Sequence, residues 1–128
     1  MPRHILISHF ENTMPKVLRW QQVSSPHEGQ ATCFSYTRGA NQEAGFVIRF
    51  KGRCYAYHNR CPHAGSPLDW VPGRFFNAGG TMLTCHTHGA CFDPMNGQPL
   101  SGPAESGLEA LPLRSESSHL MAPAELEG

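Results

Sequence analysis

The sequence predicts an all-β protein, a small antiparallel β-sandwich or barrel, and three observations lead to this prediction. Glycine and proline are abundant, at 13 and 11 of 128 residues, and both residue types punctuate a chain with turns. The apolar runs between the turns are short, and none keeps a helical period over three turns. Many short strands separated by turns are typical of antiparallel sandwiches and barrels.

The clearest strand pattern is a hairpin in the middle of the chain. Residues 46–50 and 53–57 are rich in aromatic and β-branched side chains, and Lys51-Gly52 between them is suited to a tight turn. The polar residues 39–45 predict a turn ahead of this hairpin. Weaker patterns predict further strands at residues 16–23, 31–36, 74–77, 81–85, 90–93, 97–100, 108–113 and 118–121.

The chain length fits one domain. Residues 1–15 are polar, contain two prolines and show no period, so they predict an N-terminal arm, with the domain at residues 16–128. The apolar patch Ile5–Ile7 is too short for the apolar region of a secretory signal. The longest apolar run also falls far short of the ~20 residues that cross a bilayer. We therefore expect a cytoplasmic protein with no membrane partner.

The charge balance argues against nucleic acid as a partner. Lys and Arg together number 10, as do Asp and Glu, so the formal net charge is zero. The sequence has no basic stripe and no block of like charges, which binding to a polyanion or to an anionic membrane surface normally requires.

The five cysteines point to metal binding more than to a disulfide framework. Their number is odd, and cysteines close to histidines in a reducing compartment are more often metal ligands. Cys33 and Cys54 lie in predicted strands beside aromatic residues, and we expect them to be buried thiols that only pack. Cys91 follows a candidate ligand motif, and we expect packing there as well.

Two short motifs carry the candidate ligands. The first is Cys61-Pro62-His63, and the second, after 21 intervening residues, is Cys85-His86-Thr87-His88. Two thiolates and two imidazoles suit either a tetrahedral zinc or a [2Fe–2S] cluster with the thiolates on one iron and the imidazoles on the other. Each motif is followed by a glycine, which lets backbone N–H groups approach a negatively charged centre. These residues alone leave both alternatives open.

These motifs and their flanks resemble the Rieske iron–sulfur family. The resemblance covers most of the chain, and its most specific parts are NRCPHAGSPL from Asn59 to Leu68 and CHTHGACFD from Cys85 to Asp93. An Asn96-Gly97 turn and a proline loop, Gly102-Pro103-Ala104, follow the same pattern. The resemblance implies a Rieske-type iron–sulfur fold with two cluster-binding loops, and it makes a zinc-only site the lesser alternative.

The resemblance also implies a ligand set for one [2Fe–2S] cluster per chain. Cys61 and Cys85 would bind the inner iron, and His63 and His88 the outer iron. His86 is a rival to His88 because it would form a second C-x-H pair. The family pattern uses the histidine directly before the glycine, which is His88.

Two departures from the family pattern carry further expectations. The spacing between the motifs is longer than is usual in the family, and Trp70–Gly80, which we expect to form a surface loop, accounts for the extra length. High-potential members join the two loops by a disulfide and place hydroxyl donors after the second motif. The corresponding residues here, Ser66 and Thr87, then Ala90 and Phe92, can supply neither. A low-potential cluster is therefore expected.

The resemblance implies an electron carrier of the ferredoxin type rather than an enzyme. It would take one electron at a time from a flavin reductase and pass it to an oxygenase, with the partners docking near His63 and His88. The chain has no length left for the separate iron domain that oxygenase chemistry needs. The alternatives are a small Rieske subunit of a larger oxidoreductase complex and a structural or regulatory module whose loops are held together by a metal.

Overall fold

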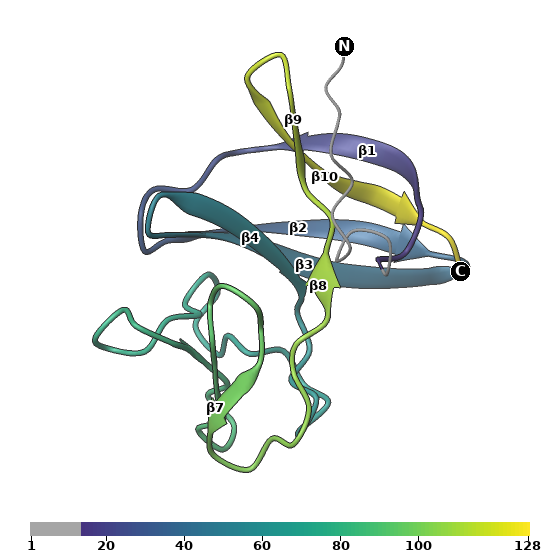
Figure 1. Cartoon of the computed structure of the whole chain (residues 1–128). Helices are drawn as coiled ribbons and strands as arrows, with labels where there is room; N and C mark the ends of the chain where they lie inside the picture. Colours follow the sequence, from purple (N-terminus) through teal and green to yellow (C-terminus); the bar gives the residue numbers. More distant parts are fainter. Residues whose placement is uncertain (1–13) are drawn as a thin grey trace.

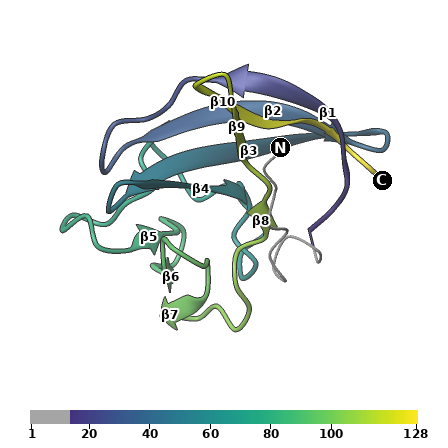
Figure 2. The same ribbon diagram turned by 45° about the horizontal axis from the view of Figure 1, so that its top comes forward.

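The structure is a computed structural model that describes residues 14–128, and within that range the chain forms two β-sheets and no helix (Figure 1). The larger sheet consists of β1 (Val17–Val23), β2 (Ala31–Arg38), β3 (Asn41–Phe50), β4 (Arg53–His58), β8 (Ala110–Leu111), β9 (Arg114–Glu116) and β10 (His119–Leu126). The smaller sheet consists of β5 (Leu83–Thr84), β6 (Cys91–Phe92) and β7 (Pro99–Ser101). Figure 2 shows the smaller sheet beneath the β4 and β8 side of the larger one. The predicted all-β class is confirmed.

The strand order of the larger sheet is β1-β10-β2-β3-β4-β8, with β9 pairing only with β10. The ladders are antiparallel except for one, because β10 runs parallel to β2 at Glu125↔Thr37 and Leu126↔Arg38. The predicted antiparallel architecture is therefore confirmed, with this one short parallel ladder as an addition. Since β10 is antiparallel to β1 and lies between β1 and β2, which run in opposite directions, it must be parallel to one of them. The predicted arm, residues 1–15, lies almost wholly outside the described residues.

The predicted central hairpin is confirmed and forms the centre of the fold. Ile48 pairs with Tyr55 across β3 and β4, and Lys51 and Gly52 in the turn have φ angles of 52° and 80°. Left-handed backbone at both positions is what a two-residue hairpin loop requires. Phe46 and Val47 on opposite faces of β3 are both fully buried. The strand is therefore covered on both sides, which explains its unbroken apolar run.

The side of β3 that faces the smaller sheet holds the core that joins the two sheets. Phe46 stacks on Phe75 with ring centroids 3.9 Å apart and an interplanar angle of 11°. The Tyr57 hydroxyl donates to the carbonyl oxygen of Pro94 at 2.7 Å, and burial raises the pKa of that phenol. Phe75 belongs to the segment expected to be a surface loop, yet it is 1% exposed. That expectation is correct for Trp70 but wrong for Phe75.

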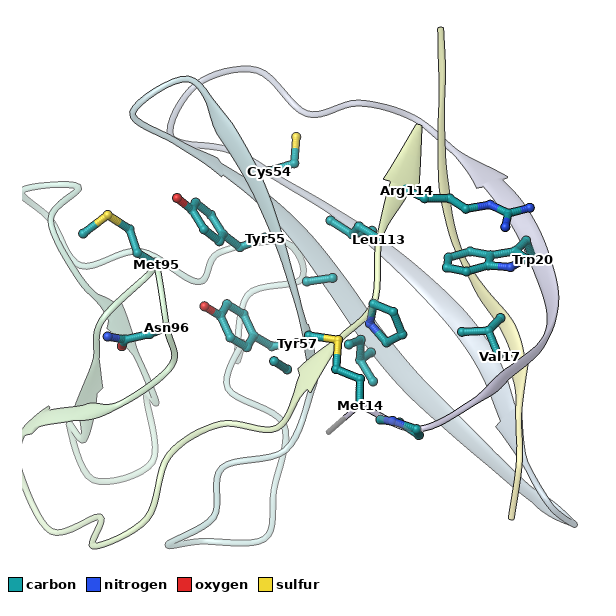
Figure 3. Close-up of a pocket in the computed structure, with 15 residues that line it drawn as sticks. Met14, Val17, Trp20, Cys54, Tyr55, Tyr57, Met95, Asn96, Leu113 and Arg114 are labelled. Carbon is teal, nitrogen blue, oxygen red and sulfur yellow. The ribbon is translucent and has the colours of Figure 1, made fainter. Parts of the chain in front are cut away.

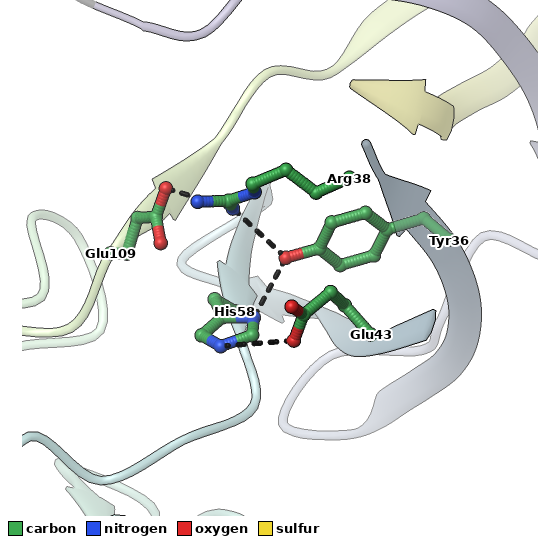
Figure 4. A network of polar contacts seen from close by, with 5 residues as sticks. All are labelled: Tyr36, Arg38, Glu43, His58 and Glu109. Atoms are coloured by element: carbon green, nitrogen blue, oxygen red, sulfur yellow. Dashed lines mark hydrogen bonds and ion pairs between the residues drawn. The ribbon is translucent and has the colours of Figure 1, made fainter. Parts of the chain in front are cut away.

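A polar network ties β2, β3 and β4 together just before the first ligand motif (Figure 4). Arg38 donates from Nη2 to the Tyr36 hydroxyl at 3.1 Å and pairs with Glu109 at 2.9 Å. The Tyr36 hydroxyl oxygen lies 2.7 Å from His58 Nδ1, and His58 Nε2 lies 3.7 Å from Glu43. The Tyr36 hydroxyl therefore joins Arg38 on β2 to His58 on β4, and the other ring nitrogen of His58 lies toward Glu43 on β3.

The Tyr36 phenol gives a prediction at alkaline pH. Burial raises its pKa to about 12, while Arg38 opposes the shift. Because the folded pKa exceeds the unfolded value of about 10, the resulting stabilisation is complete below pH ~10 and is lost as pH rises toward 12. Phenolate absorbance in wild type minus Tyr36→Phe should show one phenol ionising near pH 12. An ionisation near pH 10 in that difference would contradict the burial argument.

Candidate metal centre

The first candidate ligand loop closes on itself around Cys61. The Cys61 amide donates to the Ser66 carbonyl oxygen at 2.8 Å, and the Gly65 amide donates back to the Cys61 carbonyl oxygen at 2.7 Å. Gly65 has a φ of 72°, a left-handed conformation that glycine adopts without steric cost. The loop therefore presents a buried cysteine at its base and His63 at its exposed tip.

The second loop repeats this construction around Cys85. The Cys85 amide donates to the Ala90 carbonyl oxygen at 2.8 Å, and the Gly89 amide donates to the Cys85 carbonyl oxygen at 2.9 Å. Gly89 has a φ of 77°, in the same region as its counterpart in the first loop. Here too the cysteine is buried and the tip, including His88, is exposed. Two loops of the same hydrogen-bond pattern thus each offer one cysteine and one histidine.

Side chains link the two loops directly. The Ser66 and Thr87 hydroxyl oxygens are 3.1 Å apart, at the positions where high-potential relatives were expected to carry a disulfide. His86 also contacts the first loop, since its backbone N–H and its Nδ1 lie 3.2 Å and 3.1 Å from the Leu68 carbonyl oxygen. A carbonyl oxygen only accepts, so Nδ1 of His86 carries the proton. These contacts fix the spacing of the loops without a covalent bond.

The Ser66–Thr87 contact predicts a measurable effect on retention of the metal centre. Ser66→Ala removes one partner of a part-buried hydroxyl pair, which costs about 1 kcal/mol. We expect visible absorbance to bleach roughly fivefold faster at a fixed elevated temperature. Thr87→Val should match that rate, and the double variant should bleach no faster than either single variant. Additive effects of the two substitutions would contradict the proposed link.

The two candidate cysteines are brought together in the core. Cys61 and Cys85 are 0% and 1% exposed. Burial raises the pKa of the Cys61 thiol, as does the neighbouring Cys85 thiol, while hydrogen bonds from the backbone N–H groups of Ala64 and His63 lower it. Backbone donors aimed at a cysteine sulfur suit a thiolate bound to a metal centre of net negative charge.

The two candidate histidines are brought together at the surface. The rings of His63 and His88 have centroids 5.2 Å apart and meet at 76°. Both residues are exposed, whereas the cysteines of the same loops are buried. His86 is hydrogen-bonded to Leu68 instead, so the geometry favours His88 as the partner of His63.

This arrangement suits two metal ions better than one. A tetrahedral zinc needs four convergent ligands. A [2Fe–2S] cluster needs only two on each iron. A buried thiol pair and an exposed imidazole pair on matching loops therefore fit the chemistry of a mixed cysteine and histidine cluster.

The remaining cysteines lie elsewhere or have other contacts. Cys33 is exposed, so the expectation of a buried thiol was wrong there. It alternates along β2 with the buried Phe34 and Tyr36 and therefore points outward. Cys54 is half-buried in β4. Cys91 is half-buried as well, and its sulfur lies 3.4 Å from the Gly89 carbonyl oxygen.

Comparison with known proteins identifies the family. A model of the Rieske [2Fe-2S] domain matches residues 18–112, well over half of the chain, and the protein belongs to this family. Rieske domains carry one [2Fe–2S] cluster, which agrees with the paired ligands described above. The resemblance drawn from the two motifs is thereby confirmed. A search of curated proteins found no match.

Solved structures share the fold at low sequence identity. The ferredoxin of carbazole 1,9a-dioxygenase from Nocardioides aromaticivorans IC177 is 22% identical, with a TM-score of 0.61 over 87% of this chain and 98% of that one. A complex of reduced oxygenase and oxidized ferredoxin in carbazole 1,9a-dioxygenase is 20% identical, with a TM-score of 0.62 over 84% of this chain and 94% of that one. The terminal oxygenase of carbazole 1,9a-dioxygenase from Novosphingobium sp. KA1 is 18% identical, with a TM-score of 0.62. The match covers 87% of this chain but only 31% of that one.

No helix among the described residues is long and apolar enough to cross a membrane.

Proposed function

We propose that the chain is a Rieske-type ferredoxin that carries single electrons from a flavin reductase to an oxygenase and is not itself an enzyme. Membership of the Rieske family supports electron transfer. The observation that carries the finer proposal is that the same two loops pair His63 with His88 at the surface and bury Cys61 and Cys85. Structures of a dioxygenase ferredoxin, alone and in complex with its oxygenase, share this fold and support the choice of acceptor.

In this proposal the two cysteines and the two histidines have different roles. The cluster, when bound, supplies reversible one-electron chemistry. Cys61 and Cys85 hold the inner iron in the core and keep water away from it. His63 and His88 hold the outer iron through one ring nitrogen each and present the opposite ring edge to the partner. That partner docks over exposed loop residues, among them Pro62 and Pro103, in the small interface typical of transient redox encounters.

The surroundings of the loops support a low reduction potential. Rieske centres span roughly −150 to +300 mV, and hydrogen bonds to the cluster sulfurs raise the value within that range. Ala90 and Phe92, both fully buried after the second loop, bring no hydroxyl donor. The loops are joined by the Ser66–Thr87 contact and not by a disulfide. We therefore place the potential in the lower part of the range.

The experiment that tests the proposal is EPR spectroscopy of the purified protein reduced with dithionite, together with iron and sulfide analysis. Two irons, two sulfides and the signal of a mixed histidine and cysteine cluster would support it. Stopped-flow reoxidation of the reduced protein by candidate oxygenases then tests the acceptor. A colourless, EPR-silent protein with one zinc would overturn electron transfer. Reoxidation only within a stable multi-subunit complex would indicate an oxidoreductase subunit instead.

A further inference from the structure

A cationic hollow lies at the end of the larger sheet away from the cluster loops. It has a volume of about 500 Å³ and is bordered by the β3–β4 hairpin, the β9–β10 hairpin and the segment that follows β1. The side chains that set its chemistry are Ser25, Arg49, Arg53, Arg114, Ser118 and His119. Since β4 runs roughly 17 Å from Arg53 to His58, and the first ligand loop begins only after His58, the hollow is separate from the metal centre.

The charge in this hollow is of one sign. Its lining contains three arginines and a histidine but no Asp or Glu. Arg114 forms an exposed pair with Glu116 at 2.8 Å, whereas Arg49 and Arg53 have no carboxylate partner within residues 14–128. In a chain with a formal net charge of zero, these cations form a local concentration of positive charge. Such a concave site attracts anions.

Arg49 is held in a fixed orientation by neutral groups. It donates from Nε to the Pro26 carbonyl oxygen at 2.8 Å, from Nη1 to the Gly52 carbonyl oxygen at 3.3 Å and from Nη2 to Ser25 Oγ at 2.6 Å. A guanidinium has five N–H donors, so two remain for a ligand. A rigid, charged fork with free donors matches the oxygens of a phosphate group.

The hollow continues into a groove of about 520 Å³ that is lined by both apolar and polar groups (Figure 3). The two share Cys54, Leu113 and Arg114 as lining residues. The groove lies along β4, where β8 pairs only with Ala56 and Tyr57 and so leaves the preceding edge of the strand uncovered. Tyr55 forms part of its wall, as Figure 3 shows. Volumes of this size are typical of small-molecule sites.

We propose that the joined hollow and groove bind a small organic phosphate. The phosphate group would accept hydrogen bonds from Arg49 and Arg53, and an apolar body would pack against Cys54 and Leu113, which line both the hollow and the groove. The charge of the lining selects the phosphate, and the adjoining apolar surface selects an organic ester over inorganic phosphate.

The test is an NMR titration of the isotopically labelled holoprotein with three probes: phenyl phosphate, inorganic phosphate and phenol. Phenyl phosphate should shift the backbone amides of Arg53, Tyr55 and Ser118 and should bind more tightly than inorganic phosphate. Phenol should leave the amides of the cationic end unshifted. Arg53→Gln, at an exposed position, should weaken phenyl phosphate binding about tenfold. Arg74→Gln, an exposed arginine in the segment between the two ligand motifs, is the matched control and should not.

Four results would overturn the proposal. The first is the absence of shifts with any probe. The second is equal weakening by Arg53→Gln and Arg74→Gln, which would show unspecific ionic attraction. The third is equal affinity for the two phosphates, which would remove the role of the groove. The fourth is amide shifts that follow protein concentration without ligand, which would show that a second copy of the chain occupies the site.

Discussion

Replacing Cys85 by serine is expected to yield a protein without its cluster. Cys85 is 1% exposed and lies beside Cys61, so the substitution puts a hydroxyl where the proposed ligand set needs a thiolate. No ordinary side-chain rearrangement restores the missing ligand, because Cys85 is fixed by backbone hydrogen bonds to Ala90 and Gly89. Iron and sulfide content, visible absorbance and the EPR signal of the reduced protein should all fall to background.

Cys91→Ser is the matched control for that substitution. Cys91 is a cysteine of the same loop region, but its sulfur contacts the Gly89 carbonyl oxygen and the Thr84 hydroxyl, at 3.4 Å and 3.6 Å. A serine hydroxyl is also a donor and an acceptor, and neither contact belongs to the proposed ligand set, so this variant should keep two irons and two sulfides per chain. A cluster that survives Cys85→Ser and is lost in Cys91→Ser would show that the proposed ligand set is wrong.

The two histidines of the second loop differ in their contacts. His88 pairs with His63 at the tip, whereas His86 is hydrogen-bonded to Leu68 through Nδ1. Sequence alone could not distinguish them by spacing, because both stand at ligand distance from Cys85, and only the resemblance favoured His88. The fold supplies a physical reason, since the His88 ring meets the His63 ring while the His86 ring is held by the Leu68 carbonyl oxygen.

Local patterns predicted the strands that are buried on one or both faces and failed where a strand is polar. The aromatic and β-branched residues within Phe46–Phe50 were sufficient to predict the central hairpin, whose β3 reaches back to Asn41. The prediction of a turn at residues 39–45 was wrong from Asn41 onward. Asn41 and Gln42 are exposed polar side chains, and their strand end is stabilised by backbone pairing with β2, which a polar sequence does not indicate. β9 was missed for the same reason, since Arg114–Glu116 is exposed throughout.

The segment between the two motifs shows the limit of reasoning from spacing. An insertion that departs from a family pattern is most simply read as a surface loop, and Trp70 at 67% exposure fits that reading. Phe75 does not, because its ring fills the space between Phe46 and the smaller sheet. The predicted strand at residues 74–77 is reduced to one bridge, Phe76↔Leu83, with backbone hydrogen bonds from Thr84 to Phe75 and from Asn77 to Met82, and the packing of Phe75 adds to them.

That packing leads to the second large prediction, that Phe75→Ala loosens the smaller sheet from the larger one. Deleting a fully buried aromatic ring costs about 3–5 kcal/mol, from the lost burial and the remaining cavity. For a domain of this size the Tm should fall by roughly 10 °C or more. Because the ring touches Phe46 on one side and the core of the cluster loops on the other, visible absorbance should be lost before the far-UV signal of the larger sheet.

Trp70→Ala removes a larger aromatic side chain from the same segment and isolates the effect of burial. Trp70 is mostly exposed, so its loss should change stability by no more than about 0.5 kcal/mol. Amide hydrogen exchange provides the local measurement, with faster exchange expected for β5, β6 and β7 in Phe75→Ala and unchanged exchange in Trp70→Ala. Equal acceleration across both sheets in Phe75→Ala would show that the two sheets unfold as one unit and would contradict the predicted loosening of the smaller sheet. Loss of a contact confined to the junction should first loosen the smaller sheet, whose strands are only two or three residues long.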